Sequence, residues 1–263
     1  MNFQTTDHVR LDYTDQGEGQ PVMLLTGFGG AKEIWHRQKE ALLSQHFRVI
    51  ALDFRNQGRS QHVSWGLRLS RLATDVHELG EALHLRNQVL IGNSMGAAVI
   101  WAYLSLFGDS EITRIVVVDQ SPKMISDETW SFGFKGLNWQ TFASRLKKPL
   151  GSSTFKHIDD DTFALVNQVH TEAPFDAQID YPLLLNHATQ DWRDVIEHLE
   201  IPMLLVAGKQ SPYFDYHFAF AVQQMSSLVK VAVVPESGHV VMAEQSHLFN
   251  TLMLCFLGNG IKS

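Results

Sequence analysis

The residues of this chain best suited to do chemistry are a serine between two glycines, in Gly92-Asn93-Ser94-Met95-Gly96. A β-type apolar run at residues 88–91 precedes this stretch, and a helix-forming run follows it. A bare G-x-S-x-G is common, but at a sharp strand-to-helix turn it holds the serine in a strained conformation typical of a nucleophile. We therefore predict that Ser94 is a nucleophile, which needs a base, an acid and an oxyanion site from elsewhere in the chain.

The candidate base is His239. The chain has 13 histidines, so the choice depends on position. His239 stands in the loop directly after the last predicted strand, at residues 230–234. Most other histidines fall in predicted helices or in the middle of the chain, where packing or solvation accounts for them: His77, His84, His157, His170, His187 and His198.

Two aspartates could supply the acid, whose task is to orient the imidazole and stabilise its positive form. Asp119 directly ends a predicted buried strand, so its carboxylate would be held rigidly. Asp215 follows the next predicted strand by several residues and resembles the first turn of a helix, where a carboxylate suits the helix dipole. We favour Asp119 and keep Asp215 as the alternative acid.

The oxyanion site should combine the amide after the nucleophile with an amide from an earlier loop. The first is the Met95 N–H. The second is the Phe28 N–H in the glycine-rich stretch at residues 26–30. This stretch lacks the G-x-G-x-x-G spacing of a dinucleotide site. No metal site, P-loop or cofactor is predicted from any other spacing in the chain.

The elements that must position these residues alternate between strand and helix along most of the chain. This alternation predicts an α/β fold with an eight-stranded, mostly parallel sheet flanked by helices. Ser94, Asp119, Ser211 and His239 each follow a predicted strand, and ligands of such sheets bind beyond the carboxyl ends of the strands. The predicted strands are 2–6, 9–15, 22–25, 47–52, 89–91, 112–118, 202–207 and 230–234. The predicted helices of the core are 35–45, 69–83, a helix that begins at 97–101, 214–225 and 247–256.

Between residues 123 and 198 the alternation breaks, and no strand is predicted. The segment is rich in aromatic residues, and helices are predicted at 161–171, 181–190 and 191–199. We expect a helical cap inserted into the sheet domain, which divides the chain into a first part of the core at 1–122, the cap at 123–198 and a last part of the core at 199–263. An apolar cap over the strand ends would make a mostly hydrophobic pocket.

Composition narrows the function classes. The chain has 263 residues, 44% of them hydrophobic, and a formal net charge of −7, which argues against a nucleic-acid surface. No signal peptide or membrane-spanning run is predicted, so we expect a cytoplasmic protein with no membrane partner. The single cysteine, Cys255, excludes an intrachain disulfide and is expected to be buried in an apolar helix. None of these features predicts an oligomeric state.

At this point the chain resembles the α/β-hydrolase superfamily over its whole length. Four segments carry the resemblance in addition to the elbow at Ser94: residues 24–29, 53–60, 118–122 and 238–239. They are specific for the fold and much less so for the substrate.

Two departures from the family pattern refine this resemblance. Thr26 precedes Gly27 where the family usually has histidine, and Ser211 stands where it usually has the acid. The second departure is similar to a branch of bacterial esterases and acyl thioesterases whose acid follows the sixth strand, which implies Asp119 as acid and Ser211 as a secondary residue that hydrogen-bonds near Asp119 or His239. The segments around Asp119 and Ser94 also resemble cofactor-free haloperoxidases and perhydrolases.

The residues and the resemblance together predict a serine hydrolase that cleaves a small-molecule ester or thioester of a small or medium acyl group. Ser94 would attack, His239 would act as base, Asp119 would orient His239, and the amides of Phe28 and Met95 would hold the oxyanion. Two alternatives remain: perhydrolysis or halogenation through a peracid with the same triad, and a non-catalytic ligand-binding relative.

Overall fold

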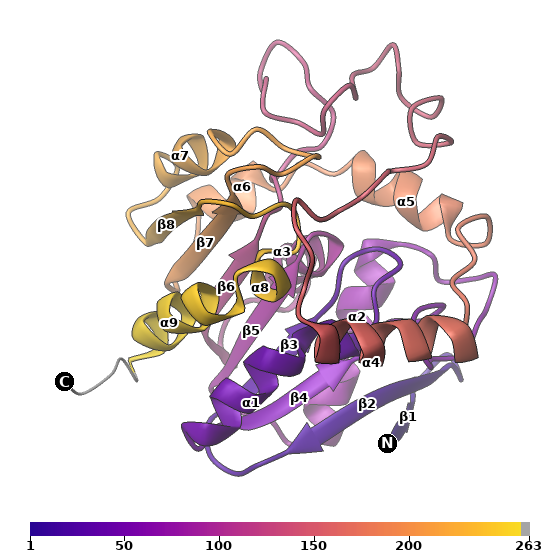
Figure 1. Cartoon of the computed structure of the whole chain (residues 1–263), viewed down its shortest axis with the longest axis vertical. Coiled ribbons are helices and arrows are strands. Elements are labelled where there is room, and N and C mark those ends of the chain that lie inside the picture. Colours follow the sequence, from indigo (N-terminus) through magenta and orange to yellow (C-terminus); the bar gives the residue numbers. More distant parts are fainter. Residues whose placement is uncertain (259–263) are drawn as a thin grey trace.

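The computed structural model describes residues 1–258. Its centre is an eight-stranded sheet in the order β1-β2-β4-β3-β5-β6-β7-β8, with helices packed on both faces (Figure 1). β1 pairs antiparallel with β2, and β2 with β4, whereas every other neighbouring pair is parallel. The structure therefore confirms the predicted α/β fold with a mostly parallel sheet.

The strands agree with the sequence prediction to within two residues at each end. They are β1 (Asn2–Gln4), β2 (Arg10–Gln16), β3 (Pro21–Leu25), β4 (Arg48–Leu52), β5 (Gln88–Asn93), β6 (Ile112–Val118), β7 (Met203–Gly208) and β8 (Val229–Val234). The helices that flank the sheet are the 3₁₀ helix η1 (Lys32–Trp35), α1 (His36–Ser44), α2 (Leu69–Ala82), α3 (Met95–Phe107), α7 (Phe218–Gln223), α8 (Val241–Glu244) and α9 (Ser246–Leu257).

Two hydrophobic clusters, one on each face of the sheet, hold the helices in place. In β5, Leu90 belongs to one cluster while Val89 and Ile91 belong to the other, as the two-residue period of a strand requires. Trp101 of α3 packs in the first cluster and Phe249 of α9 in the second. Burial on both faces explains why the central strands are almost entirely apolar.

Three details of the last part of the core differ from the prediction. Cys255 is exposed, because α9 turns Phe249, Met253 and Leu257 toward the core at four-residue spacing, and a residue two positions after Met253 faces the opposite side. α7 begins only at Phe218, since the residues before it form a turn instead of a helix. α8 was not predicted from the sequence.

The segment at residues 123–198, called the cap segment below, connects β6 to β7 and lies beyond the carboxyl ends of the strands (Figure 1). Its second half contains α4 (Asp160–Glu172), α5 (Tyr181–Ala188) and α6 (Arg193–Glu197), close to the three predicted helices. Its first half, residues 123–159, forms turns and extended stretches with no helix, so the cap segment is less helical than expected. The division of the chain into core and cap domains stays a prediction.

Polar contacts fasten the cap segment to the sheet domain. Arg37 donates hydrogen bonds to Asp159, the residue that caps the N-terminus of α4. The buried Asp180, just before α5, accepts a hydrogen bond from the Asn56 side chain. Together with the apolar contacts, these bonds fix α4 and α5 over the strand ends.

Candidate active site

Ser94 occupies a sharp turn between β5 and α3, as the sequence predicts. Its backbone has φ 54° and ψ −123°, a region that costs a non-glycine residue roughly 1–3 kcal/mol. The turn is crowded: a Cβ on Gly96 would lie 2.4 Å from the Leu25 carbonyl oxygen, and a Cβ on Gly92 would lie 2.5 Å from the Gly96 carbonyl carbon. The Ser94 N–H donates to the Val118 carbonyl at 2.9 Å, which ties the turn to β6.

Asp119 follows β6 directly and is completely buried. Its Oδ2 lies 2.7 Å from His239 Nδ1, and the Ser211 hydroxyl donates to the same oxygen at 2.6 Å. Its Oδ1 accepts the Gly208 N–H at 3.0 Å. Hydrogen bonds that favour the charged form help to offset the cost of burying a carboxylate, and they fix the direction in which Asp119 faces the imidazole.

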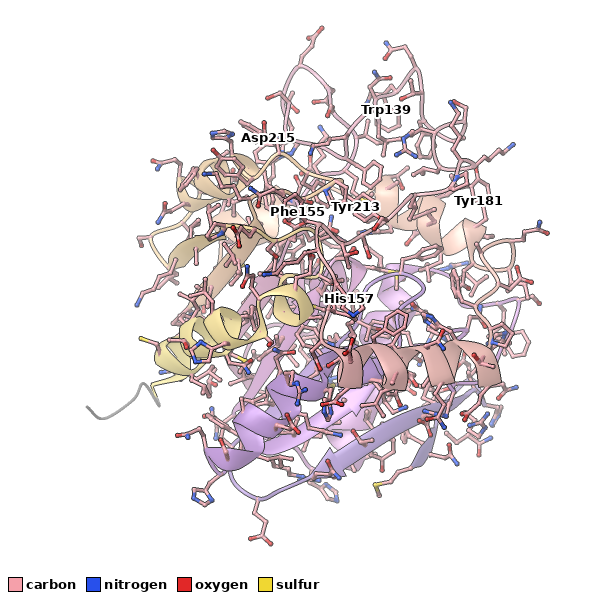
Figure 2. All side chains as sticks on the ribbon, viewed as in Figure 1. Trp139, Phe155, His157, Tyr181, Tyr213 and Asp215 are labelled. Atoms are coloured by element: carbon pink, nitrogen blue, oxygen red, sulfur yellow. The ribbon has the colours of Figure 1, made fainter. Side chains whose placement is uncertain are left out.

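Asp215, the alternative acid, is placed elsewhere. Its side chain is 56% exposed and pairs with His217 at 2.6 Å, and a backbone hydrogen bond from His217 holds the pKa of Asp215 below its usual range. Within residues 1–258 it forms no hydrogen bond or ion pair with His239. Figure 2 shows Asp215 at the outer edge of the molecule, away from Tyr213. The geometry therefore favours Asp119 over Asp215 as the partner of His239.

His239 is held from several sides in the loop after β8. Its N–H donates to the Ser153 carbonyl at 2.8 Å, and its carbonyl accepts from the Asn93 side chain at 2.9 Å. The ring of Tyr213 packs edge-on against the imidazole with centroids 4.6 Å apart. Because these contacts leave the ring little freedom, Nδ1 faces Asp119 and the opposite nitrogen is free to face the substrate side.

Ser94 and His239 line the same cavity. No hydrogen bond joins the Ser94 hydroxyl to the imidazole in the part of the chain that the structure describes. Such catalytic hydrogen bonds are often long without substrate and tighten only when it binds. The structure thus brings the predicted nucleophile and the predicted base to one cavity, with no hydrogen bond between them among the described residues.

The loop after β3 supplies the second predicted oxyanion donor. A Cβ on Gly27 would lie 3.0 Å from the Ser94 Cβ, so this loop passes directly beside the nucleophile. Gln57 supports the loop by accepting the Gly30 N–H at 3.1 Å. Among residues 1–258 neither the Phe28 N–H nor the Met95 N–H donates a hydrogen bond to another residue, which leaves both amides available to an oxyanion.

The cavity over these residues has a volume of about 1070 Å³ and separates the cap segment from the sheet domain. Most of its wall is apolar, as expected for a small-molecule site. The cap segment contributes Phe134, Leu146, Phe175 and Leu184, and the core contributes Phe28 and Phe214. Figure 2 shows Tyr181 on α5 of the cap segment, Tyr213 nearer the middle of the molecule and Trp139 in the upper part of the cap segment.

Sequence reasoning missed Glu244, which supports His239 indirectly. Its Oε1 accepts the Gly238 N–H at 3.0 Å, and its Oε2 accepts the N–H groups of Phe155 and Lys156 at 2.7 and 3.0 Å. One carboxylate of α8 therefore joins the histidine loop to the cap segment, which runs past α8 in Figure 1. Its only signal in the sequence is a glutamate five residues after His239, and the partners at 155–156 are not visible there.

Sequence reasoning also set aside His187, which the structure places on the cavity wall. It belongs to α5 and is only 4% exposed. Burial and the nearby His239 lower the pKa of His187 to about 3. No local pattern distinguishes this histidine from the others of the cap segment.

Comparison with known proteins identifies the family of the fold. The family model described as the alpha/beta hydrolase fold matches residues 20–170, and the chain belongs to this family. A putative non-heme chloroperoxidase of Synechocystis sp. is 24% identical and covers 95% of both chains. An sn-1-specific diacylglycerol lipase of Danio rerio is also 24% identical, over 97% of this chain and 85% of its own.

Solved structures support the same fold. An esterase from Exiguobacterium antarcticum superposes with a TM-score of 0.86 at 21% identity, with 98% of each chain covered. A bromoperoxidase from Bacillus anthracis superposes with a TM-score of 0.84 at 24% identity, with 98% of this chain and all of its own covered. The predicted similarity to both esterases and haloperoxidases is thus confirmed, and at these identities the structures define the fold alone.

One further finding concerns membranes. Among residues 1–258, no helix combines the length and the hydrophobicity needed to cross a bilayer.

Proposed function

We propose that this α/β hydrolase cleaves carboxylic esters or thioesters of small or medium acyl groups through an acyl-Ser94 intermediate. The observation that carries the proposal is the 2.7 Å contact between His239 Nδ1 and Asp119 Oδ2, in a cavity that also holds a serine at a strained turn. Strain at a single residue is typical of a functional site.

In the first half of the reaction, Ser94 Oγ attacks the substrate carbonyl while His239 takes the serine proton on Nε2. Asp119 keeps the imidazole in the required tautomer and stabilises its positive form. The amides of Phe28 and Met95 donate to the oxyanion of the tetrahedral intermediate, a contribution of roughly 3–4 kcal/mol per donor in comparable sites. The intermediate collapses when His239 returns the proton to the leaving alcohol or thiol.

In the second half, water replaces the alcohol. His239 takes a proton from the water as it attacks the acyl-serine, and the same two amides hold the second oxyanion. Collapse of this intermediate releases the acid and restores Ser94. The mostly apolar wall of the cavity fits an acyl group.

The test is the hydrolysis of p-nitrophenyl butanoate by the wild type and by Ser94→Ala. We expect kcat/KM to fall by at least 10³-fold in the variant. Circular dichroism confirms that both proteins are folded. Wild-type turnover by a folded Ser94→Ala variant would refute the proposal.

A second candidate function is transfer of the acyl group to hydrogen peroxide, which would produce a peracid. The similarity to a chloroperoxidase and a bromoperoxidase favours it. It requires the same acyl-serine, with peroxide in place of water in the second half. Initial rates with each acceptor, measured on the same acyl-enzyme, separate the two functions.

A further inference from the structure

His187 is a buried titratable group on the cavity wall that the proposed mechanism does not use. It stands on the same side of α5 as Tyr181 and Leu184, which also line the cavity. Within residues 1–258 neither of its ring nitrogens hydrogen-bonds to another residue, and Nδ1 is completely shielded from solvent. The wall of this cavity is mostly apolar and includes Phe134 and Leu184.

An imidazole in this position is costly to the fold. A buried polar group without a partner destabilises the fold, and such groups are few in natural proteins and call for an explanation. Because the pKa of His187 is lowered to about 3 by burial and by the neighbouring His239, the ring is neutral at ordinary pH. A neutral imidazole offers one N–H donor and one acceptor nitrogen.

The position of His187 indicates which part of the substrate it meets. The proposed general acid, His239, must deliver its proton to the oxygen of the leaving group, so the leaving group lies on the His239 side of Ser94. His187 and His239 line the same cavity and lie near enough for the charge of one to affect the other. His187 therefore lines the cavity that receives the leaving group.

We infer that His187 forms a hydrogen bond with a second oxygen of the leaving group, a hydroxyl or carbonyl a few bonds from the scissile ester oxygen. The inference deepens the proposed function and depends on it. It assigns as substrates the esters of diols, polyols or hydroxy acids, in preference to esters of simple alkyl alcohols. Because only Nδ1 of the two ring nitrogens is fully shielded from solvent, Nε2 is the atom that meets this oxygen.

The test compares two esters of one acid, 2-hydroxyethyl butanoate and n-propyl butanoate, which differ by a hydroxyl in place of a methyl group. We expect the wild type to favour the hydroxyethyl ester in kcat/KM by about tenfold or more, since a site built to hydrogen-bond a hydroxyl discriminates against the analogue that lacks it. His187→Leu should reduce this ratio to one or below, mainly through the hydroxyethyl ester. His187→Gln, which keeps a donor and an acceptor, should retain part of the preference.

The matched control is His198→Leu, which changes an exposed histidine of the cap segment outside the cavity wall. It should leave the ratio as in the wild type. An equal ratio in the wild type and in His187→Leu would overturn the inference. Failure of the wild type to hydrolyse p-nitrophenyl butanoate would instead refute the proposed function, so the two failures are distinguishable.

Thermal stability provides a readout that needs no activity. Because His187→Leu removes an unpartnered polar group, we expect Tm to rise by about 2–4 °C, which is the effect of about 1 kcal/mol in a chain of this size. A lower Tm would identify His187 as a structural residue and would overturn the inference. A gain in stability at the expense of leaving-group selectivity is typical of a residue kept for function.

Discussion

The Ser211 hydroxyl lies 2.6 Å from Asp119 Oδ2, the same oxygen that pairs with His239 Nδ1 at 2.7 Å. Ser211 stands where related folds usually carry the acid, and in this chain it donates a hydrogen bond to Asp119, the proposed acid. The Ser211 oxygen also accepts the N–H groups of Tyr213 and Phe214 at 3.3 Å. These bonds hold the turn that precedes α7 and orient the hydroxyl toward Asp119.

Replacement of Ser211 tests this contact. Ser211→Ala should lower kcat on p-nitrophenyl butanoate about tenfold, the effect of one hydrogen bond to a charged group, with KM little changed, because the bond helps Asp119 to stabilise the imidazolium in the transition state. Ser211→Thr keeps the hydroxyl and should recover most of the activity. A full kcat in Ser211→Ala would show that the contact has no part in catalysis.

A pair of conservative substitutions decides between the two candidate acids. Asp119→Asn should lower kcat by about 10⁴-fold, since an amide cannot hold the imidazole in the required tautomer. Asp215→Asn, at an exposed site beside His217, should change kcat less than twofold. The same p-nitrophenyl assay measures both variants, and the reverse order of effects would transfer the role of acid to Asp215.

Glu244 tests the link between the histidine loop and the cap segment. Glu244→Gln replaces one carboxylate oxygen by an NH₂ group, which cannot accept the backbone N–H groups now bound there. Each buried donor left without a partner costs about 1–3 kcal/mol, so we expect Tm to fall by several degrees and kcat to fall with it.

Glu236→Gln is the matched control for Glu244, because Glu236 belongs to the His239 loop that Glu244 supports and is exposed. Its Tm should stay within about 2 °C of the wild type. Equal Tm values for the two variants, measured by differential scanning calorimetry, would show that the bonds of Glu244 contribute nothing to stability.

Asp180 should make the folded protein less stable as the pH rises. Burial raises the pKa of Asp180 from 3.8 to about 6, so the folded protein holds this proton more tightly than the unfolded chain. The bound proton contributes roughly 3 kcal/mol to the free energy of unfolding. This contribution is complete below about pH 4 and is lost as the pH rises through about 6. Asp180→Asn removes this dependence and should raise Tm at pH 7.5 by roughly 6–12 °C relative to the wild type.

The measurement is the difference in Tm between wild type and Asp180→Asn at pH 4.5 and at pH 7.5. It should be small at the lower pH and large at the higher one. Asp194→Asn, at an exposed position of the cap segment, should show the same small difference at both. A difference for Asp180→Asn that does not change with pH would contradict the assignment of this titration to Asp180.

Most of the sheet could be predicted from the sequence, because each strand is marked by a short run of apolar, often β-branched residues. The run at residues 112–118 is buried and largely β-branched, and it coincides with β6. The strand ends then determine where Ser94, Asp119 and His239 lie, since parallel strands end at one edge of the sheet. For the same reason the sequence favours Asp119, which directly follows a strand, over Asp215.

Features made by contacts between distant segments could not be predicted in this way. The partners of Glu244 lie about 90 residues away in the chain, and the burial of His187 depends on how α5 packs over the cavity. Cys255 was placed in the core because α9 is apolar on more than one side. Only the packing of Phe249, Met253 and Leu257 decides which side is buried.

The central claim is that Ser94 is an activated nucleophile, and the most direct test is covalent labelling. The wild type is treated with a fluorophosphonate probe, and the modified peptide is identified by mass spectrometry. We predict a single adduct, on Ser94, which is absent from Ser94→Ala and strongly reduced in Asp119→Asn. An unlabelled Ser94, or an adduct on another residue in a protein that still hydrolyses esters, would contradict the mechanism.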